Sequence, residues 1–133
     1  MAARTKARKR ALDLLFASEM RGEGPVTALD RAVADGEGPT NEYTATLVRG
    51  VVEHQAEIDD LLARAAEGWT LQRMPAVDRN VLRLAVFEVL HVDDVPDAVA
   101  ISEAVNLVRD LSTDESPGFV NGILGTIVRN HTS

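Results

Sequence analysis

Apolar residues recur at helical spacing from near the start of this chain. Leu12, Leu15, Phe16 and Met20 follow one another at intervals of three and four, which places them on one face of a helix over residues 3–20. The basic residues in the first half of this segment point in several directions around the helix axis. We therefore expect only the second half to be buried, and the first half to project along or beyond the body of the protein.

Two further helices are predicted before residue 70. Gly22 interrupts the first pattern, Pro25 suits the first position of a short second helix, and that helix is expected to end near Gly36. A third helix is predicted from a cap at Thr40 to Gly68. Its buried face is predicted to consist of Leu47, Val51, Ile58, Leu61, Leu62 and Ala65.

The segment from Val77 to Val92 has a different pattern. Eight of the ten residues from 81 to 90 are apolar, and they surround the whole helix, which is typical of a helix at the centre of a domain. Arg83 and Glu88 are the exceptions, and we expect them at edges of this helix or in ion pairs.

Two more helices complete the prediction. One starts from a cap in the Asp93–Asp94 pair with Pro96 in its first turn, and the other starts at Ser116–Pro117. The expected fold is all-α: a bundle of six or seven helices without strands, forming one domain over residues 1–133. The Gly/Pro-containing stretch 68–76 is expected to divide an N-terminal half, residues 1–68, from a C-terminal half, residues 76–133.

Composition restricts the compartment. The chain has 133 residues, is 45% hydrophobic and contains no cysteine, so disulfides, thiolate nucleophiles and sulfur-ligated zinc are excluded and a reducing compartment is favoured. Its basic start lacks the apolar stretch of a secretory signal, and no run approaches the roughly 20 apolar residues that cross a bilayer. We expect a cytoplasmic protein with no membrane partner.

Catalytic and cofactor chemistry finds little support in the sequence. No nucleotide-binding glycine motif and no nucleophile elbow is present, so we predict neither an enzyme nor a cofactor. His54 lies near an apolar stripe and is expected to be a partly buried structural residue. His91, Asp93 and Asp94 are bunched beside a helix start, and a capping role is favoured over a metal site.

Charge is distributed very unevenly along the chain. The formal net charge is −7, yet five of the fourteen basic residues precede the first acidic one, leaving nine basic against twenty-one acidic residues in positions 11–133. These five residues are Arg4, Lys6, Arg8, Lys9 and Arg10. Such a segment is typical of nucleic-acid binding, although a merely solvated basic end remains an alternative.

Several segments resemble one family in order and spacing. The C-terminal ones are VLRLAVFEVL (81–90), DVPDAVAISEAVNLVRDL (94–111) and SPGFVNGILGTI (116–127), and the N-terminal ones are ARKRALDLLF (7–16) and LVRGV (47–51). Together they are similar to the NusB family over nearly the whole chain. The resemblance implies an all-helical fold of two subdomains and a role in transcription antitermination without catalysis.

The resemblance also implies partners and binding residues. We expect boxA-type single-stranded RNA of ribosomal RNA operons as a ligand, NusE, a small-subunit ribosomal protein, as a partner, and assembly into the antitermination complex on RNA polymerase. The RNA contacts are expected at Arg4, Lys6, Arg8, Lys9, Arg10, Phe16, Glu115 and Phe119. For Phe119, a core position is an equal alternative, because it shares helical spacing with Ile123 and Ile127.

Other functions remain open at this point. One is a non-catalytic protein–protein adaptor whose acidic body is the docking surface. Another is the RNA-binding module of a system like the ribosomal RNA methyltransferases, although the chain lacks the cysteine and cofactor fold of such an enzyme. The sequence also leaves open a symmetric homodimer.

Overall fold

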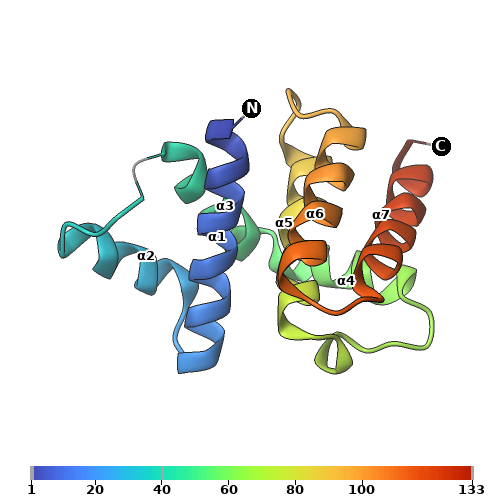
Figure 1. Cartoon of the computed structure of the whole chain (residues 1–133), viewed down its shortest axis with the longest axis horizontal. Coiled ribbons are helices and arrows are strands. Elements are labelled where there is room, and N and C mark those ends of the chain that lie inside the picture. The colour runs from blue at the N-terminus through green and yellow to red at the C-terminus, as the bar shows by residue number, and fades with distance from the viewer. Residues whose placement is uncertain (1, 40, 133) are drawn as a thin grey trace. The chain divides into compact units, whose positions relative to one another are not determined.

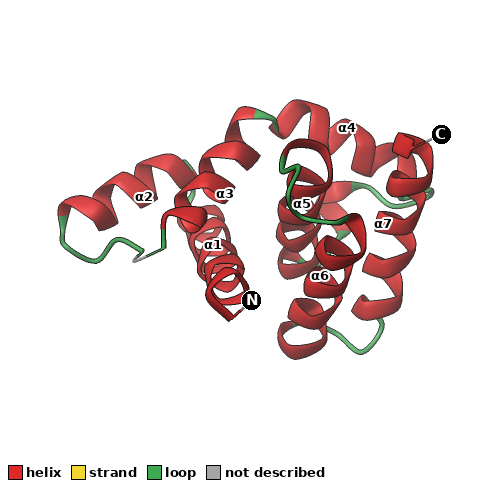
Figure 2. Cartoon of the chain, turned by 90° about the horizontal axis from the view of Figure 1, so that it is seen from above, coloured by secondary structure: helices red, strands yellow, loops and turns green. Residues whose placement is uncertain are grey.

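The computed structural model describes residues 2–39 and 41–132. These residues form seven α-helices and one short 3₁₀ helix, and none of them lies in a strand (Figure 2). The all-α prediction is therefore confirmed. Within the described residues, no helix has both the length and the apolar character needed to cross a bilayer.

The chain divides into two compact units, Met1–Glu53 and His54–Ser133. The expected boundary at residues 68–76 lies instead inside the second unit. The reason is that the helix preceding this stretch, α4 (Gln55–Ala65), packs against helices that follow it, so the stretch connects two elements of one core.

The first unit consists of α1 (Ala2–Arg21), α2 (Pro25–Ala34) and α3 (Glu42–Glu53), which contact one another pairwise (Figure 1). Leu12, Leu15, Leu29 and Leu47 are buried in this unit and contribute about 1.5–3 kcal/mol each by removal from water. Met20, which the periodicity placed on the same face, is 58% exposed instead.

Each connection in the first unit has a glycine with positive φ close to the end of the preceding helix. At Gly22 (φ +70°), the amide of Glu23 donates to the carbonyl of Ser18, and at Gly36 (φ +76°), the amide of Glu37 donates to the carbonyl of Ala32. These bonds satisfy carbonyls at the ends of α1 and α2. The Glu23 carboxylate also accepts two hydrogen bonds of 2.7 Å from the guanidinium of Arg31, and these bonds lower the pKa of the Glu23 carboxyl.

The prediction of a single helix over residues 40–68 is wrong, because this segment forms two helices. His54 has non-helical backbone angles (φ −106°, ψ +15°), so that α3 ends at Glu53 and α4 begins at Gln55. The predicted cap Thr40 lies outside the described residues. The side chain of Asn41 accepts a hydrogen bond from the Tyr43 amide at 2.8 Å and so caps α3.

The second unit also contains the 3₁₀ helix η1 (Leu71–Arg73), α5 (Ala76–His91), α6 (Asp97–Leu111) and α7 (Ser116–Thr132). Helix α5 contacts α4, α6 and α7, which confirms its central place. Arg83 is paired as expected, with two bonds of 2.8 and 3.0 Å to Asp59 of α4, whereas Glu88 is only 1% exposed and lies in the core rather than at an edge. Pro96 precedes α6 instead of lying in its first turn.

Candidate nucleic-acid interface

The basic segment of α1 is docked against the start of α3. Asn41 Nδ2 donates to the carbonyl of Ala3 at 3.1 Å, and Thr44 Oγ1 donates to the carbonyl of Ala7 at 3.2 Å. Ala7 and Arg8 are both buried. The expectation that only the second half of this helix is buried is therefore wrong, because polar side chains of α3 hold the backbone of its first half in place.

Two of the predicted RNA-binding arginines lie over the ring of Tyr43. The guanidinium carbon of Arg4 lies 4.3 Å from the centroid of the Tyr43 ring, and that of Arg8 lies 5.8 Å from it. Both distances are in the range of cation–π attraction. Arg8 is only 5% exposed, so its guanidinium has little surface to offer a ligand, while Arg4 is half-buried.

Lys6 and Arg10 share a groove in the first unit. The groove has a volume of about 580 Å³, and its other lining residues are Ala3, Ala7, Gly38, Pro39, Asn41 and Thr44. Arg10 Nη2 donates to the carbonyl of Glu37 at 3.2 Å, which holds this guanidinium at the groove. The two cationic side chains, beside backbone groups and the side-chain amide of Asn41, form a surface that suits the phosphates of a nucleic-acid backbone.

Lys9 and Phe16 are placed differently. Lys9 is exposed, and its ammonium lies 3.4 Å from Asp13 Oδ2, one turn further along α1. Such an exposed ion pair is weak, so Asp13 competes little with a phosphate for the Lys9 ammonium. Phe16 is half-buried in the second half of α1.

Glu115 and Phe119 lie in the second unit, at the start of α7. They line a small cavity of about 180 Å³ together with Trp69, Pro75, Asp78, Thr113 and Ser116. The rings of Trp69 and Phe119 meet edge to face, with centroids 5.9 Å apart. Phe119 is half-buried while Ile123 and Ile127 are buried, so Phe119 lies at the margin of the core and not within it.

Sequence reasoning missed Trp69 as a candidate site residue. It is the single tryptophan of the chain and is 51% exposed, in the loop after Gly68. The sequence did contain a signal for it: Trp69 lies outside every helical apolar repeat, so packing of a helix does not explain a large aromatic residue at this position.

A buried carboxylate holds the turn that carries Glu115. Asp78 of α5 accepts hydrogen bonds from Ser112 Oγ at 2.6 Å and from Ser116 Oγ at 2.8 Å. The amide of Thr113 donates to Ser116 Oγ at 3.2 Å. Asp78 and Ser116 are 2% and 1% exposed, so this network ties the α6–α7 turn to the beginning of α5.

The predicted RNA-binding residues therefore belong to two units. Six of them lie on α1 in the first unit, and Glu115 and Phe119 lie at the start of α7 in the second. A model of the NusB family matches residues 5–129 of the chain. The chain belongs to the NusB family. Transcription antitermination is therefore its function, and it is not an enzyme.

Relatives within the NusB family are similar over most of their length. The transcription antitermination protein NusB of Nocardioides sp. is 75% identical over all of this chain and 98% of its own. That of Saccharopolyspora erythraea is 60% identical over 96% of this chain and 87% of its own.

Solved NusB structures have the same fold. NusB of T. maritima superposes with a TM-score of 0.87 at 37% identity, covering 98% of this chain and 93% of its own. A crystal structure of the antitermination factors NusB and NusE in complex with dsRNA contains a chain with a TM-score of 0.83 at 28% identity, covering 98% of both chains.

Proposed function

We propose that this chain binds boxA-type single-stranded RNA of ribosomal RNA operons together with NusE, and helps assemble the antitermination complex on RNA polymerase. The observation that carries the proposal is the groove on α1 and its neighbouring loop, where Lys6 and Arg10 converge in a chain of net charge −7. The complex of a structural relative with NusE and dsRNA supports the pairing with NusE and the binding of RNA.

Phosphate neutralisation would supply most of the affinity in this arrangement. Cations that contact phosphates release condensed counterions, and this release favours binding at low salt. Lys6 and Arg10 line the groove and Arg4 is partly accessible, whereas the buried Arg8 would act by holding Tyr43 and the segment in place. The acidic remainder of the chain would repel RNA that is not held at this groove.

Aromatic side chains would supply the second kind of contact. Single-stranded RNA exposes base faces that stack on aromatic rings. Phe119, in the first turn of α7, forms an aromatic pair with the exposed Trp69, and the half-buried Phe16 is a further candidate on α1. Glu115 beside Phe119 offers a carboxylate that can accept hydrogen bonds from base amino groups.

We expect the double substitution Lys6→Ala and Arg10→Ala to weaken RNA binding and reduce its salt dependence. Loss of two phosphate contacts should make the slope of log K against log salt shallower by about 1.4, at about 0.7 per contact with a single strand. Fluorescence anisotropy with a boxA-like RNA, measured over a salt series with and without purified NusE, gives this slope.

Arg49→Ala is the matched control for that pair. Arg49 is an exposed arginine of the same unit, and its guanidinium lies 2.7 Å from Asp30. It should leave the slope unchanged. Equal binding of a boxA-like and a scrambled strand would favour an interaction that depends on charge alone. An RNA duplex that binds better than the single strand would contradict the single-strand assignment. Binding of NusE without binding of RNA would identify a protein–protein adaptor.

We expect Phe119→Leu to weaken binding of the same RNA about fivefold. Leucine keeps an apolar contact but loses the ring face, and stacking of a base contributes about 1–3 kcal/mol when the whole aromatic side chain is removed. The fluorescence of Trp69, whose ring contacts Phe119, should change on RNA addition. Leu111→Ala, at an exposed apolar position of this unit, is the control, and an unchanged affinity of Phe119→Leu would remove Phe119 from the interface.

A further inference from the structure

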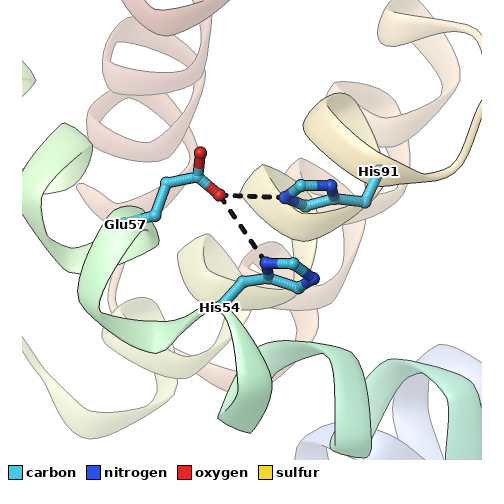
Figure 3. Close-up of side chains that lie close together, drawn as sticks. All are labelled: His54, Glu57 and His91. Atoms are coloured by element: carbon cyan, nitrogen blue, oxygen red, sulfur yellow. Dashed lines mark hydrogen bonds and ion pairs between the residues drawn. The ribbon is translucent and has the colours of Figure 1, made fainter.

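Two histidines and a glutamate converge in the second unit, apart from the groove and the aromatic pair. His54 directly precedes α4, Glu57 lies in the first turn of α4, and His91 is the last residue of α5. Figure 3 shows both imidazoles facing the Glu57 carboxylate. Glu57 Oε1 lies 2.9 Å from His91 Nε2 and 3.8 Å from His54 Nδ1, and the three ligand atoms all lie within 4.8 Å of one another.

Hydrogen bonding explains only part of this arrangement. The contact between His91 and Glu57 has hydrogen-bond length, but 3.8 Å between His54 Nδ1 and Glu57 Oε1 is too long for one. The two imidazole rings are stacked, with centroids 3.8 Å apart and planes 20° apart. Each ring therefore directs a nitrogen toward the same carboxylate oxygen, and His91 Nε2 donates its proton to Glu57 Oε1 and must give this proton up to bind a metal ion.

Imidazole nitrogen and carboxylate oxygen are ligands that Zn²⁺ binds at about 2.0–2.2 Å. In a tetrahedral site, such ligand atoms lie about 3.4 Å apart, and the observed 2.9 and 3.8 Å fall on either side of this value. The rings must turn for both nitrogens to meet one ion. The terminal torsion of histidine is broad, so each ring can turn about it, at the cost of the ring stacking and of the bond from His91 to Glu57.

The surroundings favour an ion that is held on one side and open on the other. The buried ring of Phe87 backs both histidines, with centroid distances of 6.0 Å to His54 and 5.7 Å to His91. Glu57 is exposed, which leaves a solvent position for a fourth ligand. Within the described part of the chain, this is the one group of three histidine or carboxylate side chains with such spacing.

We propose that His54, Glu57 and His91 form a Zn²⁺ site with water as the fourth ligand, which joins the start of α4 to the end of α5. The site stabilises the second unit, because an ion that binds the folded chain only shifts the folding equilibrium toward it. Sequence reasoning did not find this group, because it compared His91 with its chain neighbours Asp93 and Asp94, whereas its partners lie 34 and 37 positions earlier.

Isothermal titration calorimetry of the untagged, chelator-treated full chain with ZnCl₂ tests the proposal without RNA or NusE, so that its outcome is independent of the proposed function. We expect one ion per chain and a rise of Tm with Zn²⁺. His91→Gln and His54→Gln should each raise the Kd by at least about tenfold. His131→Gln is the matched control, because it removes the third histidine, which lies outside the group, and it should leave the Kd unchanged.

NMR of the wild-type imidazole resonances provides a measurement that no variant can confound by misfolding. Zn²⁺ should shift the resonances of His54 and His91 at one equivalent and leave those of His131 in place. The proposal is overturned if His131 alone responds, if Zn²⁺ leaves all three unchanged, or if His54→Gln and His91→Gln bind Zn²⁺ as tightly as the wild type.

Discussion

A Leu82→Ala variant is expected to lose about 2–5 kcal/mol of the free energy of unfolding of the second unit. Leu82 is fully buried on α5, the helix in contact with α4, α6 and α7. Truncation removes buried methyl groups and leaves a cavity that helices packed on several sides cannot easily close. The loss is a large share of the roughly 5–15 kcal/mol typical of whole domains.

Urea titration followed by Trp69 fluorescence measures this loss, because the single tryptophan lies in the second unit and reports on its unfolding. Leu111→Ala is the control: Leu111 is 41% exposed on α6, and its truncation should cost less than about 1 kcal/mol. Equal losses in the two variants would show that α5 is not the centre of this core.

Periodicity was sufficient to predict α5 and failed at residue 54. A helix that is apolar around its circumference has one stable environment, so its central place follows from composition alone. By contrast, Val51 and Ile58 are seven positions apart, which fits one continuous helix as well as two. The break at His54 depends on which helices α3 and α4 pack against, and that choice is made by tertiary contacts.

The candidate site was predictable in kind but not in detail. Charge asymmetry alone indicated the basic residues, and the structure gathers Lys6 and Arg10 at one groove. The burial of Arg8 was not predictable, because it depends on Tyr43, which lies 35 positions away along the chain. Trp69 and the Asp78 network were missed for the same reason, since each acquires its partner only when distant helix ends meet.

Asp78→Ala is expected to lower the free energy of unfolding of the second unit by about 2–4 kcal/mol. Hydrogen bonds to a charged group contribute about 1.5–3 kcal/mol each, and relief from burying the carboxylate offsets part of their loss. The Ser112 and Ser116 hydroxyls, at 2.6 and 2.8 Å, would lose their acceptor. Because these serines begin and end the turn that carries Glu115, we expect RNA affinity to fall as well.

A double-mutant cycle separates the network from a general effect of altered charge. Once Asp78 is alanine, Ser116→Ala should cost much less than it does in the wild type, because the bond between them is already gone. Asp114→Ala removes an exposed carboxylate from the same turn and should change stability by no more than about 0.5 kcal/mol. Additive losses in the cycle would mean that Asp78 and Ser116 act separately, and that the turn is held by the packing of α7 alone.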